Sequence, residues 1–361
     1  MIPADQPTFK FARVSRPEDV PPEDPRVIDI ALLDMNFGFP NLGHDSLVLS
    51  VGAFERELRP LLAAAGLAVR IVSYEVRNLA MVPELPGRFK LYLGTGGPGH
   101  IDPAQNDGRA PWAQGVHEDG DAWEPAAHRL FDAILATPDA AMLGVCHSFG
   151  VLCRWLGVAR PTLRGPEKGG KSTGVQQNLL TAEGRGHPWF ARFAAQLADG
   201  QRVSVMDSRL FDLIPTGALP AGMTAIAHEV LPSGARGDAL TMLELARDAG
   251  GVMPRFLAMN HHPEIYDPGM QQQLVNERIT AGHVSEEWRA ERRRIIHSLR
   301  NPAIEWKIRL TARIALLDPL RFHLLRLVRL RHEQLAGASP VHEEEVIAAA
   351  VPGEVPRRPA W

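Results

Sequence analysis

Hydrophobic runs alternate with segments of helical apolar spacing through the first two thirds of the chain. The alternation begins with a continuous apolar run that predicts a buried strand at Val27–Asp34. The elements expected after it are, in order, a helix at Leu47–Ala65, strands at Leu67–Val72 and Leu91–Leu93, a helix at Trp123–Ala136 and a strand at Ala141–Val145. Because strand–helix–strand units of this length form right-handed crossovers, we expect an α/β fold with a doubly wound, mostly parallel sheet. Ligand-binding groups should then lie at the carboxyl ends of its strands.

The two ends of the chain differ from this pattern. Residues 1–26 hold repeated prolines among charged residues, which predicts an extended arm, and the α/β unit is expected to span residues 27–268. Residues 269–336 are poor in glycine and rich in Leu, Ile, Arg and Glu, which predicts a helical extension, followed by a loose tail at 337–361. The helices expected in this region are Glu286–Leu299, Ala303–Leu317 and Leu320–Leu335, and a further short helix is expected at Leu240–Ala249.

Composition argues against several classes of protein. The 361 residues carry a formal charge of −3, with 45% hydrophobic and 22% charged residues, so charge gives no overall attraction to nucleic acid or membranes. No apolar stretch has the length of a signal peptide or a membrane span. The two cysteines, Cys146 and Cys153, would lie about 10 Å apart on one helix, too far for a disulfide. We therefore expect a reduced, cytoplasmic protein.

Cys146 stands where a short apolar strand turns into a segment that can be helical. The stretch Ala140–Leu152 reads Ala-Ala-Met-Leu-Gly-Val-Cys-His-Ser-Phe-Gly-Val-Leu. A nucleophile on such a tight turn projects from the end of a sheet, and the small residues Gly144 and Ser148 let neighbouring backbones approach. The turn also directs the backbone N–H of His147 toward a developing oxyanion. The alternative is a buried cysteine at the end of a core strand.

Two further strand ends favour the catalytic interpretation. Leu91–His100 runs from an apolar strand into four glycines and a proline, so that backbone N–H groups can line a pocket. Phe256–Ile265 places His262 two residues before Glu264, as a relay of cysteine, histidine and acid requires. Each stretch alone is also compatible with a turn or a polar strand end. All three in this order favour a nucleophilic site.

These motifs resemble those of the class I (triad-type) glutamine amidotransferases, which share a Gly-Gly-Pro-Gly strand end, a Gly-x-Cys turn and a C-terminal His-Pro-Glu. The resemblance covers roughly residues 27 to 268 and implies a flavodoxin-like fold. It implies that Cys146 is the nucleophile, His262 the base and Glu264 the residue that orients the base. His261 is set aside because the family's histidine directly precedes Pro-Glu. The residues to which the resemblance gives oxyanion or substrate-binding roles are Gly96, Gly97, His147, Asp207 and Ser208; no metal or other cofactor is implied.

The resemblance also implies a reaction. It is hydrolysis of the side-chain amide of glutamine through a thioester, with ammonia passed to an unidentified acceptor or a synthetase partner. The common elbow reads Gly-x-Cys-x-Gly-x-Gln; here Ser148 replaces the second glycine and Gly150 replaces the glutamine, which helps to hold the substrate. Two alternatives therefore stay open. One is a hydrolase or peptidase of another γ-glutamyl amide that needs no synthetase, and the other is a non-catalytic regulatory binding protein.

A phosphate-loop pattern, G-x-x-x-x-G-K-S, occurs at Gly165–Ser172. Pro161 interrupts the segment before it and Gly174 follows within two residues, so a strand and a helix are not expected on its two sides. We interpret the stretch as a surface turn, or as a basic lip over the active site that binds an anionic co-substrate. Weaker candidates for substrate contact are Asp34, Asn36 and His228.

Two stretches of the helical extension, Arg289–Ile296 and Arg321–Arg331, are basic and amphipathic. We expect their apolar faces to pack on the α/β core or on a second subunit, with solvated arginines. Contact with a membrane surface is the less favoured interpretation. No nucleic-acid partner is expected, because no aromatic platform accompanies the charge.

Overall fold

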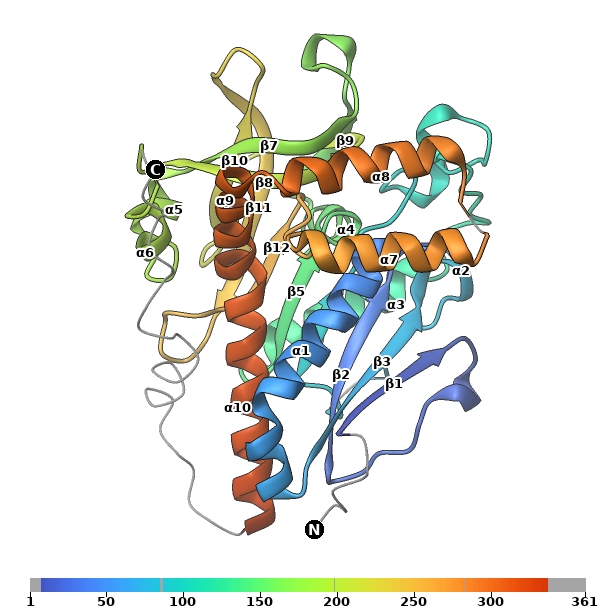
Figure 1. Ribbon diagram of the computed structural model, residues 1–361, viewed down its shortest axis with the longest axis vertical. Coiled ribbons are helices and arrows are strands. Elements are labelled where there is room, and N and C mark those ends of the chain that lie inside the picture. The colour runs from blue at the N-terminus through green and yellow to red at the C-terminus, as the bar shows by residue number, and fades with distance from the viewer. Residues whose placement is uncertain (1–7, 85–86, 198, 283, 337–361) are drawn as a thin grey trace.

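A mixed sheet forms the centre of the protein (Figure 1). In the residues that the computed structural model describes, 8–84, 87–197, 199–282 and 284–336, twelve strands join in it. One half is parallel, in the order β1-β3-β2-β4-β5-β12. The bounds of these strands are β1 Phe9–Val14, β2 Val27–Asp34, β3 Ala68–Glu75, β4 Leu91–Gly94, β5 Ala141–Val145 and β12 Pro254–Met259.

The other half of the sheet is antiparallel and continues beyond β12. Its order is β11-β10-β7-β8, while β9 pairs with β11 and β6 pairs with β9. The bounds are β6 Ala159–Leu163, β7 Ser172–Leu180, β8 Arg202–Arg209, β9 Phe211–Pro215, β10 Thr224–Val230 and β11 Arg236–Arg247. The sequence pattern did not predict this antiparallel half of the sheet, which supplies one wall of the candidate site.

Helices cover both faces of the parallel half. On β2, Ile30 and Leu32 pack with residues of α1 (Leu42–Ala65) and α10 (Asp318–Ala336). Ala31 and Leu33, which point to the opposite face, pack with α3 (Glu124–Ala136) and α4 (His147–Leu156). Figure 1 shows α1 and α10 side by side on one face. The predicted α/β class, with a doubly wound sheet and a C-terminal helical extension, is confirmed.

The C-terminal helices pack back on the α/β unit. Their bounds are α7 Pro268–Thr280, α8 Glu286–Leu299, α9 Pro302–Ala312, a π-helical turn at Arg313–Leu317, and α10. Phe322, Leu324 and Val328 of α10 are fully buried against the sheet, so its apolar face packs on the core as predicted. In Figure 1, α7 and α8 cross the molecule at one end of the sheet.

Several element boundaries differ from those expected. Helix α1 begins at Leu42, earlier than predicted, because the Asn41 side chain caps it by accepting from the Gly43 and His44 N–H groups at 2.6 and 3.3 Å. Within the expected N-terminal arm, residues 9–14 form β1 at the edge of the sheet. The expected tail at 337–361 lies outside the described residues.

The helix predicted at Leu240–Ala249 is wrong, because this segment belongs to β11. Its Leu, Met, Glu and Ala residues favour helices, but pairing with β10 and β12 and burial override that preference. The remaining short helices are α2 Val76–Leu79, α5 Ala182–Gly186 and α6 Ala191–Ala194. Within the described ranges, the helices lack the combination of length and hydropathy that crossing a bilayer requires.

Candidate active site

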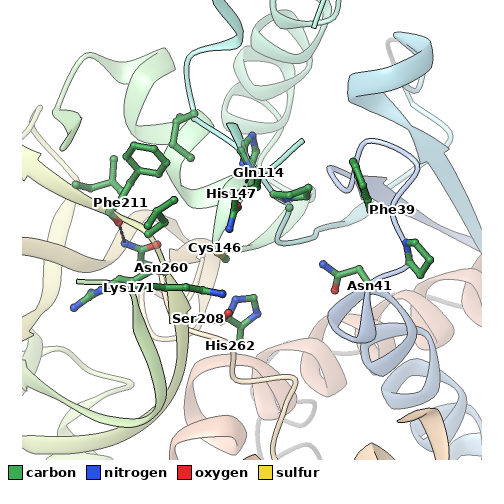
Figure 2. Close-up of a pocket in the computed structure, with 18 of the residues that line it drawn as sticks. Phe39, Asn41, Gln114, Cys146, His147, Lys171, Ser208, Phe211, Asn260 and His262 are labelled. Carbon is green, nitrogen blue, oxygen red and sulfur yellow. Dashed lines mark hydrogen bonds between the residues drawn. The ribbon is translucent and has the colours of Figure 1, made fainter. Parts of the chain in front are cut away.

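Cys146 occupies the sharp turn between β5 and α4. Its backbone has φ of 50° and ψ of −101°, a conformation that costs a non-glycine residue about 1–3 kcal/mol. The turn is tied to the neighbouring strand because the Cys146 N–H donates to the carbonyl oxygen of Met259 at 2.7 Å. The side chain of Cys146 lines a cavity of about 210 Å³ (Figure 2). Strain at a strand end that presents a nucleophile is typical of catalytic elbows.

Small residues allow close packing around this elbow. Ser148 stands where the common elbow has glycine, and its buried hydroxyl donates to the Thr95 carbonyl oxygen at 2.8 Å. A Cβ atom on Gly94 would lie only 2.5 Å from Ser148 Oγ, so the glycine on β4 makes room for the serine. This departure from the common elbow is therefore accommodated without disturbing the turn.

Gly150, the second departure, faces an apolar side chain. A Cβ atom on Gly150 would lie 2.5 Å from Ile101 Cδ1, and Ile101 itself lines the cavity. The space beside this position of α4 is therefore filled by isoleucine, where the common elbow would offer the polar side chain of glutamine.

His262 and Glu264 follow β12 and form a buried pair. His262 Nδ1 lies 2.7 Å from Glu264 Oε1, and the two side chains are 8% and 0% exposed. Burial alone would lower the pKa of His262, but the nearby Glu264 carboxylate and Cys146 raise it well above its ordinary value. The imidazole is held between a thiol and a carboxylate, in the order that a nucleophilic relay requires. Figure 2 shows Cys146 and His262 at the same cavity.

Gly96 and Gly97 bring backbone close to this pair. A Cβ atom on Gly96 would lie 2.9 Å from His262 Cε1 and 3.3 Å from Cys146 Cβ. On Gly97 it would lie 2.1 Å from the Met35 carbonyl oxygen, which is backbone and has little freedom to move. Both positions therefore require glycine, and Gly97 lines the cavity beside Cys146.

The buried side chain of Arg77 holds the glycine segment in place through hydrogen bonds to the backbone. The Arg77 guanidinium donates to the carbonyl oxygens of Met35 and Pro98 at 2.9 and 2.7 Å. It also pairs with Glu118 at 2.9 Å, with both side chains almost fully buried. This charge-assisted network holds the backbone N–H groups of the glycine segment in one arrangement.

The remaining predicted residues divide into two groups. His147 and Ser208 line the cavity. Burial and the nearby Arg77 charge lower the pKa of His147 well below its ordinary value, so its ring is neutral. Asp207 does not line the cavity: it is buried, accepts from Ser172 Oγ at 2.6 Å and pairs with a neighbouring arginine. We therefore regard Asp207 as a structural residue.

The weaker candidates lie away from the cavity. Asn36 Nδ2 donates to Asp34 Oδ1 at 2.5 Å in a buried pair. His228 accepts from Arg236 at 3.1 Å in a separate hollow. His261 is buried, and burial lowers its pKa to about 3. Of the two adjacent histidines, His262 lines the cavity and His261 does not.

Sequence reasoning missed most of the cavity wall. The wall residues that no motif indicated include Asn41, Gln114, Arg209, Phe211 and Arg292. They come from separate segments, and each is an ordinary residue in its local sequence, so the fold alone brings them together. Lys171 lies in the phosphate-loop-like stretch, which continues into β7 and not into a helix, so it is no phosphate loop; Lys171 nevertheless lines the cavity.

No group of three or more His, Cys, Asp or Glu side chains in the described ranges is arranged to hold a metal ion.

Comparison with known proteins finds solved structures whose fold is similar to that of this chain. No protein-family model matches the chain, and no curated protein matches it. The chain is similar to the structure of a glutamine amidotransferase from Thermotoga maritima, with 13% identity, 83% of this chain and 98% of that chain covered, and a TM-score of 0.47. It is also similar to the glutaminase domain of Trypanosoma brucei CTPS with bound acivicin, with 13% identity, 66% and 86% covered, and a TM-score of 0.37. Values this low do not determine chemistry.

Proposed function

We propose that the protein hydrolyses a small carboxamide through a thioester on Cys146, as the class I glutamine amidotransferases that its motifs resemble do. The observation that carries the proposal is the buried His262–Glu264 pair, 2.7 Å apart, which shares its cavity with a cysteine on a strained strand-end turn. Glutamine or another γ-glutamyl amide is the proposed substrate, and its ammonia passes to water or to an acceptor or partner yet to be identified.

The first half of the reaction forms the thioester. His262 takes the Cys146 proton, which makes the sulfur nucleophilic, and the thiolate attacks the amide carbon. The oxyanion that develops accepts from backbone N–H groups at Gly97 and His147. His262 then gives the proton to the amide nitrogen, the C–N bond breaks, and ammonia leaves. Glu264 orients the ring and stabilises its charge, so its role is positioning.

The second half releases the acid. A water molecule attacks the thioester carbon while His262 accepts its proton, and the same N–H groups stabilise the second oxyanion. The C–S bond breaks, the carboxylic acid leaves, and the Cys146–His262 pair is restored. Only the Cys146 sulfur is bonded to the acyl group, so a serine in its place should block both halves.

The test measures ammonia release from glutamine and a panel of γ-glutamyl amides, with wild type beside Cys146→Ser. Mass spectrometry after acid quenching should detect the acyl group on Cys146. Cysteine-dependent ammonia release supports the proposal. If every amide is left intact and iodoacetamide does not modify Cys146, the proposal fails and a non-catalytic binding role becomes the better explanation.

One observation favours the hydrolase alternative over ammonia transfer from glutamine. Gly150 packs on Ile101 at the position where the glutamine-using elbow carries a substrate-holding side chain. An amide other than free glutamine is therefore a second candidate substrate. Faster ammonia release from such an amide than from glutamine, without any added partner, distinguishes the two.

A further inference from the structure

The cavity beside Cys146 is lined by cations, and its described wall contains no carboxylate. Lys171, Arg209 and Arg292 contribute to the wall, whereas Asp and Glu are absent from the described residues that form it. At about 210 Å³ the cavity is smaller than the roughly 300–1,000 Å³ of pockets for drug-sized ligands, so it suits a small metabolite. A ligand there meets positive charge and finds no acidic side chain for an ammonium group.

The charge of Arg209 is balanced within the protein. Its Nε lies 3.2 Å from Asp207 Oδ2 and 3.4 Å from Asp212 Oδ1, and its Nη2 lies 3.3 Å from Glu229 Oε2. All of these side chains are almost fully buried. Lys171 and Arg292 are not surrounded by carboxylates in this way.

Lys171 reaches the cavity through a glycine turn immediately before β7. Gly169 and Gly170 have φ of 79° and 68°, which lets the chain reverse there. The ammonium group of Lys171 lies 3.8 Å from Glu291 Oε1, at the long end of an ion pair. In Figure 2 the Lys171 side chain extends across the cavity toward Ser208 and His262.

Arg292 comes from α8 in the C-terminal extension. Its guanidinium lies over the Trp288 ring, 5.6 Å from the ring centre, in a cation–π contact. Its Nε is buried and has no hydrogen-bond partner among the described residues. Burial lowers the pKa of Arg292, the charge of the adjacent Glu291 opposes this shift, and the same carboxylate is the one near Lys171. Two cations therefore share one carboxylate, which leaves an excess of positive charge that a ligand can neutralise.

We propose that the cavity binds a carboxamide that carries a carboxylate and no ammonium group, with Arg292 and Lys171 holding the carboxylate. This inference rests on the proposed function for the reaction at Cys146 and adds the charge of its substrate. The member of the class that matches glutamine is glutaramate, the carbon skeleton of glutamine without the α-amino group. Helix α8 is then part of the substrate site, and the phosphate-loop-like stretch supplies an anion-binding lysine.

The first test alkylates Cys146 with iodoacetate, an anion, and iodoacetamide, its neutral counterpart. In both reactions the sulfur bonds to the methylene carbon and iodide leaves, so charge is the main difference. The quantity to measure is the rate constant for iodoacetate divided by that for iodoacetamide, and this ratio is normalised to the same ratio for N-acetylcysteine. The normalised ratio should be about five or more, which means that Cys146 prefers the anionic reagent. Cys146→Ser shows whether the label is on Cys146.

Variants of α8 test whether Arg292 and the adjacent Glu291 determine this ratio. Arg292→Gln should lower the ratio about fivefold, whereas Glu291→Gln should raise it by releasing both cations. The matched control is Arg293→Gln on the exposed side of α8, which should leave it unchanged. If iodoacetamide modifies Cys146 and the ratio is the same in wild type and Arg292→Gln, the inference fails and the proposed function stands. If neither reagent modifies Cys146 and every amide is left intact, both fail.

The second test compares amides of different charge. The ratio kcat/KM should fall from glutaramate to glutamine to the α-amide of glutamine, which lacks a carboxylate. Arg292→Gln should raise KM about tenfold for glutaramate and should not raise it for the α-amide, because only a carboxylate loses its partner. Hydrolysis of glutamine in preference to glutaramate, or an equal loss for all three amides in the variant, would overturn the inference while leaving thioester chemistry intact.

Discussion

The Glu264 carboxylate lies directly against Gly43 in the first turn of α1. A Cβ atom on Gly43 would be 2.6 Å from Glu264 Oε1, the same oxygen that contacts His262 Nδ1 at 2.7 Å. It would also lie 2.9 Å from the Asn41 Oδ1 that caps the helix. A segment far from Cys146 in the sequence therefore determines where the carboxylate can sit.

Gly43→Ala should consequently slow the reaction without unfolding the protein. The added methyl group displaces a carboxylate that is fully buried and cannot move freely, so His262 loses its orientation, and kcat should fall about ten- to a hundredfold. The measurement is ammonia release together with the rate of Cys146 alkylation by iodoacetamide. The control is Gly52→Ala in the same helix, where the nearest atom, Phe9 Cε1, is 3.6 Å away, so activity should be retained. Full activity in Gly43→Ala would contradict this.

The strain at Cys146 predicts that removing the nucleophile can stabilise the fold. Cys146→Gly and Cys146→Ala both lack the thiol, but only glycine adopts φ of 50° and ψ of −101° without steric cost. The free energy of unfolding in urea should be about 1–2 kcal/mol higher for the glycine variant than for the alanine variant. Both should be inactive. Equal stabilities would show that the turn stores no strain.

The sequence indicated most of the parallel strands because they are largely apolar runs, whereas β1, in which lysine and arginine interrupt the apolar residues, was expected to be part of an extended arm. The bounds of β2 and β5 agree with those expected, and so do those of α8. The catalytic candidates could be found because Cys146, His262 and the glycine segment each follow such a run. Strand β11 was missed because burial between two strands outweighs its helical composition.

The rest of the site could not be predicted because long-range packing assembles it. Arg292 reaches the cavity only because α8 folds back across the sheet, and its local sequence is that of any basic helix. Asp207 comes after a run of apolar residues in β8, as an active-site acid could, yet it pairs with Arg209 and accepts a hydrogen bond from Ser172. Whether a polar residue at a strand end faces the cavity or the interior depends on neighbours that are distant in the sequence.

The raised pKa of His262 predicts a pH dependence of stability. A group whose folded pKa exceeds its unfolded value, here 6.5, contributes stability that is present below pH 6.5 and lost as pH rises through the folded value. Glu264→Gln removes the carboxylate that counteracts burial, so this contribution should shrink. The wild type should therefore exceed the variant in free energy of unfolding by more at pH 6 than at pH 10. Urea unfolding across this range measures the difference, and parallel pH profiles would contradict the assignment.

A buried network of ion pairs around Glu229 lies next to the turn that ends at Lys171. Glu229 Oε2 lies 2.8 Å from Arg164 Nη1 and 3.3 Å from Arg209 Nη2, and Glu229 Oε1 lies 2.9 Å from Lys168 Nζ. Burial would raise the pKa of Glu229, but hydrogen bonds from Lys168 and Arg164 lower it below its ordinary value. The carboxylate thus holds three cations together.

Glu229→Gln should lower the free energy of unfolding at pH 7 by about 3 kcal/mol, because it removes one of the two carboxylates that pair with Arg164 and Lys168, the other being Asp212. The loss should diminish as pH falls, since protonation removes the same charge from wild type. Urea unfolding measures it, with Glu18→Gln as the control: that side chain is 65% exposed beside Arg16, and its midpoint should not move. The turn from Arg164 to Lys171 should loosen with the network, so the iodoacetate preference of Cys146 should also fall. An unchanged stability would mean that Asp212 alone balances these cations.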